Sequence, residues 1–270
     1  MNQDTSRDRM SKQRVVYTLP GMEALAVRRG EPYQVTDAGA LTMDVYYPPD
    51  FERRGRVPAL ILVTGFADPG AERMLGSKFK DMGSFVSWAQ LAAASGIAGI
   101  TYTNREPADV RDVLDYVRQN AASLGIDPDR LGIWACSGHG PNALSVLIEH
   151  GSARPACAAL VYPYTLDLDG STGVADAAAQ FRFVTPAAGR AVADLPSDVP
   201  LYIVRAGADR TPGLNDALDR FIGAALRHNL PITIVNYPQG QHAFDLFDGR
   251  TAVHEVVRQV LAFLKFHLAA

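Results

Sequence analysis

Cysteines and metal-binding motifs are nearly absent from this sequence. Cys136 and Cys157 are the only cysteines in 270 residues, too few for a disulfide framework or a cysteine-rich zinc site. The six histidines include no HExxH pair and no His/Asp cluster at ligand spacing. We therefore expect two free thiols with no disulfide between them, and a site that uses neither a metal nor a cofactor.

The sequence also lacks a strong charge of either sign and any long apolar run. Its 26 Lys and Arg against 29 Asp and Glu give a net charge of -3, which offers no footprint for nucleic acid or an anionic membrane. No stretch matches a membrane-spanning helix, and residues 1–14 lack the apolar core of a signal peptide. These absences predict a cytoplasmic protein that acts on a small molecule and binds neither nucleic acid nor membrane. Self-association into a homo-oligomer is left open.

What the sequence does contain is a repeated alternation of strand and helix patterns. Hydrophobic residues make up 47% of the chain, so we expect one globular domain over 15–270 after a polar tail at 1–14. From Pro58 onward, short apolar runs alternate with helical spacing, which is typical of a parallel sheet covered by helices on both faces. The sequence therefore predicts an α/β fold with a mostly parallel central sheet.

The individual elements follow from these patterns. Parallel strands are predicted at 59–65, 98–104, 130–136, 156–163, 201–207 and 232–238. Helices are predicted at 84–96, 107–125, 141–150, 214–229 and 251–268. Two earlier segments, Val15–Thr18 and Leu41–Tyr47, are predicted to form an antiparallel edge of the sheet.

One interval breaks the alternation, from about Thr165 to Val199. Long interruptions between parallel strands of a compact domain are usually functional, so we interpret this one as a small cap or lid over the carboxyl edge of the sheet. Phe181 and Phe183 within it are candidates to line a substrate pocket. The alternative is a surface helix without a role.

Ser137 stands at a sharp turn between a predicted strand and a predicted helix. A nucleophile elbow has this arrangement, and it needs small residues two places before and after the nucleophile. Those positions hold Ala135 and His139. Taken alone, a serine here is equally consistent with a structural helix N-cap.

The segment WACSGHG, together with motifs downstream, resembles the α/β-hydrolase family, in particular its dienelactone-hydrolase-like and small-esterase branches. The resemblance covers the chain from Leu41 to its end. It departs from the family's G-x-S-x-G motif, which becomes Ala-Cys-Ser-Gly-His with the second glycine displaced to Gly140. The resemblance implies the α/β-hydrolase fold and hydrolysis of an ester, lactone or related acyl bond through an acyl-enzyme.

The resemblance also implies a base and an acid for Ser137. Asp209 follows one predicted strand and His242 follows the next, in the family's order Ser, Asp, His, and carboxyl ends of parallel strands converge at one edge. We therefore predict a triad of Ser137, His242 and Asp209. Rival acids, each less favoured than Asp209, are Asp167, Asp245 and Asp248.

An oxyanion hole is implied at two backbone N–H groups, those of Phe66 and Gly138. Phe66 follows Gly65 in ILVTGFADPG, where the family has its His-Gly oxyanion motif, although a plain turn would also explain this stretch. The side chains of Phe66 and His139 are predicted to contact substrate. We expect His139 to modulate catalysis and not to act as the base.

Two other interpretations stay open. A non-catalytic binding protein could share this fold, and Cys136 could be the nucleophile, as in some dienelactone-hydrolase relatives. Against Cys136, its position two residues earlier is Trp134, too large for the elbow. A nucleotide-binding enzyme is disfavoured because no G-x-G-x-x-G or P-loop lysine motif occurs.

Overall fold

The protein is built around one sheet. The structure, a computed structural model, describes residues 10–37, 39–53, 55–149, 154–168 and 173–269. Within them, eight strands lie in the order β1-β2-β4-β3-β5-β6-β7-β8. The strands are β1 (Val27–Thr36), β2 (Gly39–Tyr46), β3 (Val57–Leu62), β4 (Ala98–Tyr102), β5 (Ile126–Cys136), β6 (Cys157–Val161), β7 (Leu201–Ala206) and β8 (Ile232–Tyr237). β2 is antiparallel to both neighbours, and the other pairs are parallel.

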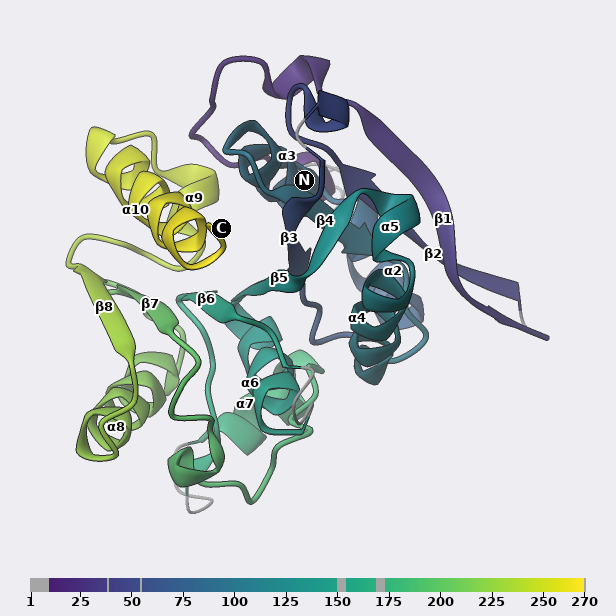
Figure 1. Ribbon diagram of the computed structural model, residues 1–270. Coiled ribbons are helices and arrows are strands. Elements are labelled where there is room, and N and C mark those ends of the chain that lie inside the picture. Colours follow the sequence, from purple (N-terminus) through teal and green to yellow (C-terminus); the bar gives the residue numbers. More distant parts are fainter. Residues whose placement is uncertain (1–9, 38, 54, 150–153, 169–172, 270) are drawn as a thin grey trace.

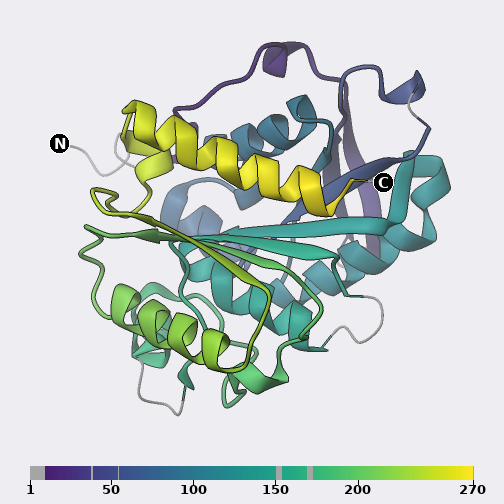
Figure 2. The ribbon, with the colours of Figure 1, turned by 60° about the vertical axis from the view of Figure 1, so that its left-hand side comes forward.

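Helices cover both faces of this sheet. They are α2 (Asp68–Leu75), α3 (Gly83–Ala94), α4 (Val110–Gln119), α5 (Ala121–Leu124), α6 (Gly140–Glu149), α7 (Val174–Phe181), α8 (Leu214–Arg227), α9 (Phe244–Phe247) and α10 (Thr251–His267). α3 and α10 lie on one face, while α4, α6 and α8 lie on the other (Figure 1). Figure 2 shows α10 and α8 on opposite sides of the strands.

Burial along β3 shows why its sequence is apolar at every position. Ala59 and Ile61 belong to the core beneath α4, α6 and α8, whereas Leu60 and Leu62 belong to the core beneath α3 and α10. Successive side chains of a strand point to opposite faces, so a strand covered on both sides needs apolar residues throughout. The predicted parallel sheet with helices on both faces is thereby confirmed.

One of the two strands predicted for the antiparallel edge of the sheet was wrong. β2 confirms the strand predicted at Leu41–Tyr47, but Val15–Thr18 forms no strand. Its amides bond elsewhere: Val15 N–H donates to Ser87 Oγ at 3.0 Å and Val16 N–H to the Asp245 carbonyl at 2.8 Å. The partner of β2 is instead β1, which the sequence pattern did not reveal.

Residues 10–14, placed by sequence in a polar tail, contact the domain. Gln13 Nε2 donates to the Leu246 carbonyl at 2.6 Å, and Arg14 Nη2 donates to Gln90 Oε1 of α3 at 2.5 Å. Residues 1–9 lie outside the described residues.

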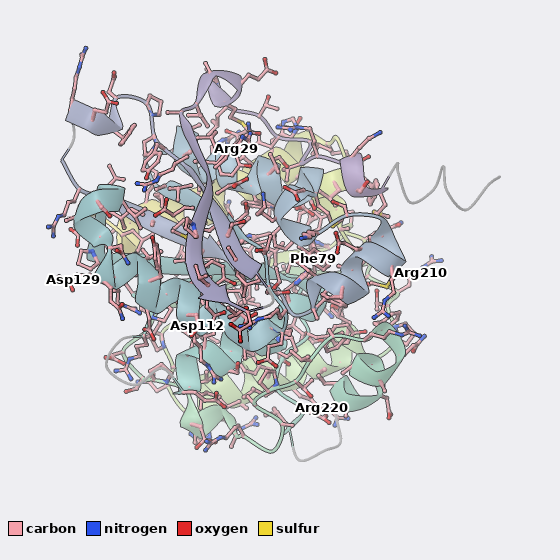
Figure 3. All side chains as sticks on the ribbon, turned by 90° about the vertical axis from the view of Figure 1, so that its right-hand side faces the viewer. Arg29, Phe79, Asp112, Asp129, Arg210 and Arg220 are labelled. Atoms are coloured by element: carbon pink, nitrogen blue, oxygen red, sulfur yellow. The ribbon has the colours of Figure 1, made fainter. Side chains whose placement is uncertain are left out.

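Several charged residues lie on the surface around this core. Arg29, Asp129 and Arg220 are exposed at separate places on the surface (Figure 3). In the part of the chain that the structure describes, no helix combines the length and apolar character needed to cross a membrane.

Candidate active site

Ser137 lies where β5 ends and the segment leading into α6 begins, in a strained backbone conformation. Its φ is +49°, in the left-handed region that side chains with a Cβ rarely adopt. Strain of this kind persists only where the surroundings hold it, and it is concentrated at functional sites. Ala135 two residues earlier is fully buried, as a small residue at that position should be. The local geometry is therefore that of a nucleophile elbow.

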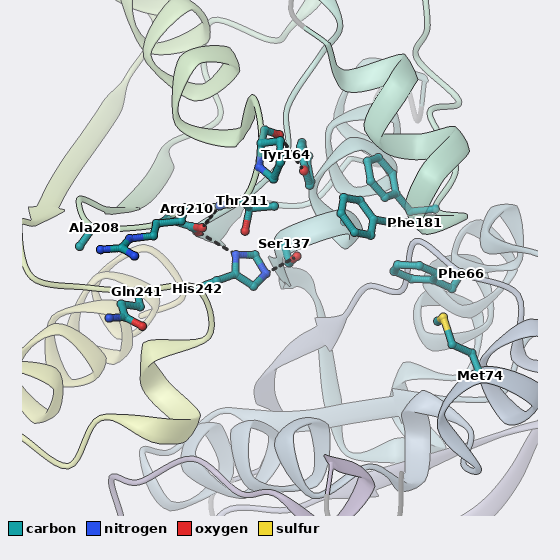
Figure 4. A pocket seen from close by; sticks show the side chains of 14 residues that line it. Phe66, Met74, Ser137, Tyr164, Phe181, Ala208, Arg210, Thr211, Gln241 and His242 are labelled. Carbon is teal, nitrogen blue, oxygen red and sulfur yellow. Dashed lines mark hydrogen bonds and ion pairs between the residues drawn. The ribbon is translucent and has the colours of Figure 1, made fainter. Parts of the chain in front are cut away.

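The three residues predicted as a triad lie in hydrogen-bond contact (Figure 4). Ser137 Oγ is 2.8 Å from His242 Nε2, and His242 Nδ1 is 2.7 Å from Asp209 Oδ2. They follow β5, β8 and β7, three parallel strands whose carboxyl ends share one edge. Proximity to the Asp209 carboxylate favours a proton on Nδ1, which leaves Nε2 free to accept the serine proton.

Asp209 is held as a charged acceptor. Its side chain is fully buried, and Oδ1 accepts the Thr211 N–H at 2.8 Å. Burial alone would raise the pKa of Asp209, but the hydrogen bonds from His242 and Thr211 outweigh burial, so the pKa lies below its ordinary value.

Two of the rival acids are engaged elsewhere. Asp245 accepts hydrogen bonds from the Tyr162 hydroxyl and the Trp88 indole, and Asp248 pairs with Arg250. Of these carboxylates, Asp209 is the one in contact with the imidazole of His242.

A buried polar cluster, which the sequence analysis did not predict, lies behind His242. The Tyr162 ring centroid lies 5.1 Å from that of His242, and Tyr162 itself has a φ of +39° directly after β6. Its hydroxyl donates to Asp245 Oδ1 at 2.5 Å, and Trp88 Nε1 donates to Asp245 Oδ2 at 2.8 Å. Burial raises the pKa of Asp245, and these two hydrogen bonds oppose that effect.

Cys136 lies beside this buried cluster, packed against the core beneath α3 and α10. Burial raises the pKa of the Cys136 thiol well above its ordinary value, so the thiolate that a nucleophile needs is disfavoured. Cys157 begins β6, whereas Cys136 is paired with the last residue of β6, and both cysteines are free thiols.

The loop after β3 lies directly against the elbow. A Cβ on Gly65 would meet the Gly138 carbonyl oxygen at 2.3 Å, so only glycine allows this approach. Phe66 and Gly138, the predicted oxyanion residues, both line the cavity above Ser137. The Phe66 N–H makes no hydrogen bond to any described residue, so it is free to serve a ligand.

Two asparagines that sequence reasoning missed fasten this loop. Asn104 donates through Nδ2 to the Phe66 carbonyl at 3.1 Å and to Thr64 Oγ1 at 2.6 Å. Asn142 of α6 donates through Nδ2 to the Thr64 carbonyl at 2.6 Å. The position of Asn104 was a usable signal, because it closes the predicted strand AGITYTN at the same sheet edge as the triad.

A cavity of about 550 Å³ opens above Ser137. One side is apolar: it includes Phe66, Phe181 and Phe183 as predicted, with Met74 of α2 and Tyr164 in addition. Figure 4 shows Phe66, Met74 and Phe181 together on one side of Ser137, and Arg210 and Gln241 on the other. The interval from Thr165 to Val199 thus contributes aromatic walls, although its residues 169–172 lie outside the described part. In the described residues no group of three or more His, Cys, Asp or Glu side chains could hold a metal ion.

The prediction that His139 contacts substrate was wrong. Its side chain is 5% exposed and lies outside the cavity lining. The imidazole turns instead toward the loop after β3, where Gly65 N–H donates to Nδ1 at 2.8 Å. The displaced glycine also has a reason, because a Cβ on Gly140 would meet the Tyr164 carbonyl oxygen at 2.2 Å. Glycine is therefore needed at position 140. At position 139, the space beside Gly65 is large enough for the histidine side chain.

Strand order, helix placement and the elbow together define the class of structure: the chain has the α/β-hydrolase fold. Structural comparison supports this across nearly the whole chain. A fungal esterase from Rhizomucor miehei superposes with a TM-score of 0.71 at 15% identity, over 99% of this chain and 91% of that one.

Two further structures show the same likeness. An α/β hydrolase enzyme from the metagenome of Lake Arreo, Spain, gives a TM-score of 0.69 at 20% identity over 99% of this chain and 88% of that one. A thermophilic esterase from Thermogutta terrifontis gives 0.65 at 19% identity over 93% and 94%. No protein-family model and no curated protein sequence matches the chain. The similarity is therefore one of fold at low sequence identity.

Proposed function

We propose that the protein is a serine hydrolase that cleaves carboxylic esters through an acyl-enzyme. The observation that carries this proposal is the continuous contact from Ser137 Oγ through His242 to Asp209, at 2.8 and 2.7 Å, beside an apolar cavity. A nucleophile, a base and an orienting carboxylate in this order are what acyl transfer requires.

In the first half of the reaction, His242 Nε2 accepts the Ser137 hydroxyl proton while Oγ bonds to the ester carbonyl carbon. The carbonyl oxygen becomes negative, and the N–H groups of Phe66 and Gly138 stabilise it. The imidazolium then gives its proton to the alcohol oxygen as the C–O bond breaks, and Asp209 stabilises the imidazolium meanwhile. Water repeats the sequence on the acyl-enzyme: His242 accepts its proton, the acid leaves, and Ser137 regains its hydrogen.

The substrate class we propose is an ester with a short apolar acyl group. Aromatic side chains form one side of the cavity, and burial of apolar surface there favours a hydrocarbon chain over a charged one. In keeping with this, the Thermogutta esterase binds propionate and butyrate, and it has been phosphonylated by sarin. A lactone would suit the same chemistry, which keeps the dienelactone-hydrolase-like activity as a second candidate.

The test is hydrolysis of p-nitrophenyl butyrate by the wild-type protein and Ser137→Ala, followed by mass mapping of an organophosphonate adduct. We expect turnover that Ser137→Ala lowers by roughly 10⁴-fold or more, and an adduct on Ser137. An adduct on Cys136 would move the nucleophile. Absence of both turnover and adduct, for esters and lactones alike, would indicate a binding protein instead.

A further inference from the structure

The His139 side chain joins the nucleophile elbow to the amide of Gly65. Gly65 N–H donates to His139 Nδ1 at 2.8 Å, so Nδ1 is the unprotonated nitrogen and the neutral ring carries its proton on Nε2. The bond reaches from the second residue after Ser137 to the residue before Phe66.

The surroundings of His139 keep the ring in that state. The rings of Phe66, Phe79 and Phe85 lie with centroids 5.0, 4.6 and 5.2 Å from that of the imidazole. Figure 3 shows Phe79 within the outline of the molecule. Burial lowers the pKa of His139 to about 3, so Nδ1 remains an acceptor at neutral pH.

The peptide group that carries the Phe66 N–H is held at its other atoms. The carbonyl oxygen of Gly65, in the same peptide group, accepts the Val184 N–H at 2.9 Å. In a trans peptide the N–H points opposite to the C=O, so this contact directs the Phe66 N–H away from Val184. The next carbonyl, that of Phe66, is bound by Asn104. His139 holds the N–H of Gly65. Together, the contacts at the Gly65 N–H, the Gly65 carbonyl and the Phe66 carbonyl hold the Phe66 N–H in one orientation.

We infer that His139 is a positioning residue whose neutral imidazole holds the Gly65 amide and so aims the Phe66 N–H at the substrate oxyanion. This inference rests on the proposed hydrolase function and adds a part to it. The residue that departs from the elbow motif replaces a small side chain by a hydrogen-bond acceptor, so the departure supplies the oxyanion loop with an anchor from the elbow itself.

A nearly isosteric pair of variants separates this role from simple packing. His139→Asn places an amide oxygen where His139 has Nδ1, whereas His139→Leu places a methyl group there. In the aromatic surroundings the amide NH₂ of asparagine lacks partners, so His139→Asn should be the less stable variant by urea midpoint. If the acceptor matters, His139→Asn should nevertheless be the more active one.

We expect His139→Leu to lower kcat about 10- to 100-fold with KM within about three-fold, somewhat less than removal of a whole oxyanion donor. If His139→Leu lowers kcat by the full 100-fold, the kcat of His139→Asn should be at least about ten-fold higher than that of His139→Leu. Phe85→Leu, which removes packing against the same ring without touching Gly65, is the matched control and should keep kcat within about three-fold. Activities that follow the urea midpoints, or an unchanged kcat for His139→Leu, would overturn the inference.

A measurement on the wild-type protein covers the case in which a variant does not fold. Imidazole ¹⁵N spectra between pH 5 and 8 should show His139 as the neutral form with its proton on Nε2 throughout. A proton on Nδ1 would exclude the bond from Gly65 and refute the inference. This readout needs no turnover, so failure of the hydrolase proposal, seen as no ester cleavage and no Ser137 adduct, is distinct from failure of the role of His139.

Discussion

Asp245, three residues after His242, accepts the Tyr162 hydroxyl at 2.5 Å in a fully buried setting, while the Tyr162 ring packs beside the His242 imidazole. Asp245 thus anchors the loop that carries His242. Without its carboxylate, the Tyr162 hydroxyl and the Trp88 indole N–H are left as buried donors.

We therefore predict that Asp245→Ala lowers the free energy of unfolding by about 2–4 kcal/mol, since each unsatisfied buried donor costs about 1–3 kcal/mol. Urea unfolding measures this. The control is Asp248→Ala in the same loop, where the partly exposed pair with Arg250 and the hydrogen bond from the Tyr237 hydroxyl are lost. This should cost about 1 kcal/mol, less than the loss for Asp245→Ala. Equal losses for the two variants would contradict an anchoring role for Asp245.

Asp209 gives a prediction for pH. Its pKa is depressed in the folded protein, so the stability it contributes is present above the ordinary value of 3.8 and is lost as pH falls through the lower folded value. The difference in unfolding free energy between wild type and Asp209→Asn should shrink as the pH falls below about 4. Chemical denaturation at stepped pH tests this, and a difference that grows toward acid would reverse the sign.

The same variant should also report on catalysis. Asn at position 209 cannot stabilise an imidazolium, so Asp209→Asn should lower kcat by about 10³- to 10⁴-fold at neutral pH. Asp248→Asn removes a carboxylate near His242 in sequence that makes no hydrogen bond to the imidazole among the described residues, and it should keep most of the wild-type rate. Comparable losses in both would mean that general electrostatics, and not the His242 contact, controls the rate.

Cys136 should be dispensable for turnover. Because its thiol is buried and Ser137 Oγ holds the contact with His242, Cys136→Ala should remain active and lose about 1 kcal/mol of stability or little more. Steady-state hydrolysis together with thermal unfolding measures both. A folded but inactive Cys136→Ala variant would make Cys136 a candidate for the nucleophile again.

Phe183 should set the length of acyl chain that the cavity accepts. It is 5% exposed, stacks on Tyr164 at 4.9 Å and lies against Gly138 beside the nucleophile. Phe183→Ala should move the ratio of kcat/KM for octanoate over butyrate esters upward by about ten-fold, a range expected for added methylene space. Phe181→Ala, at a side chain 37% exposed, should change that ratio much less. Equal changes of this ratio in the two variants would mean that the exposed mouth of the cavity, and not Phe183 alone, limits the acyl chain length.

Sequence patterns predicted the parallel strands, and they singled out Ser137, His242 and Asp209, which the fold brings into hydrogen-bond contact. Both inferences depend on local signals: continuous apolar runs, and polar residues just past strand ends. β1 was not predicted, because its charged residues together with Gly30 and Pro32 interrupt any alternation of apolar and polar positions. It also lies at the edge of the sheet, where few of its side chains need to be apolar. The segment Val15–Thr18 had the composition of a strand, but the amides of Val15 and Val16 donate to a serine hydroxyl and a loop carbonyl.

The direction of the His139 side chain could not be predicted in the same way. A pocket position was the natural expectation for a residue two places after a nucleophile. Whether the imidazole turns toward substrate or core depends on the space beside Gly65 and on Phe79 and Phe85, which come from segments far away along the chain. Contacts of this kind exist only once the sheet is assembled.

The hydrogen bond from Val184 to Gly65 joins the segment that would select a substrate to the loop that would activate it. In the proposed hydrolase, this hydrogen bond would therefore couple substrate recognition to the reaction rate. A laboratory graft that replaces 173–199 with a foreign connector has to supply its own amide to Gly65, or a gain in substrate range will arrive together with a slower enzyme. Substitution of the Phe183 side chain alone, which leaves the Val184 amide in place, offers the safer evolutionary path to new esters.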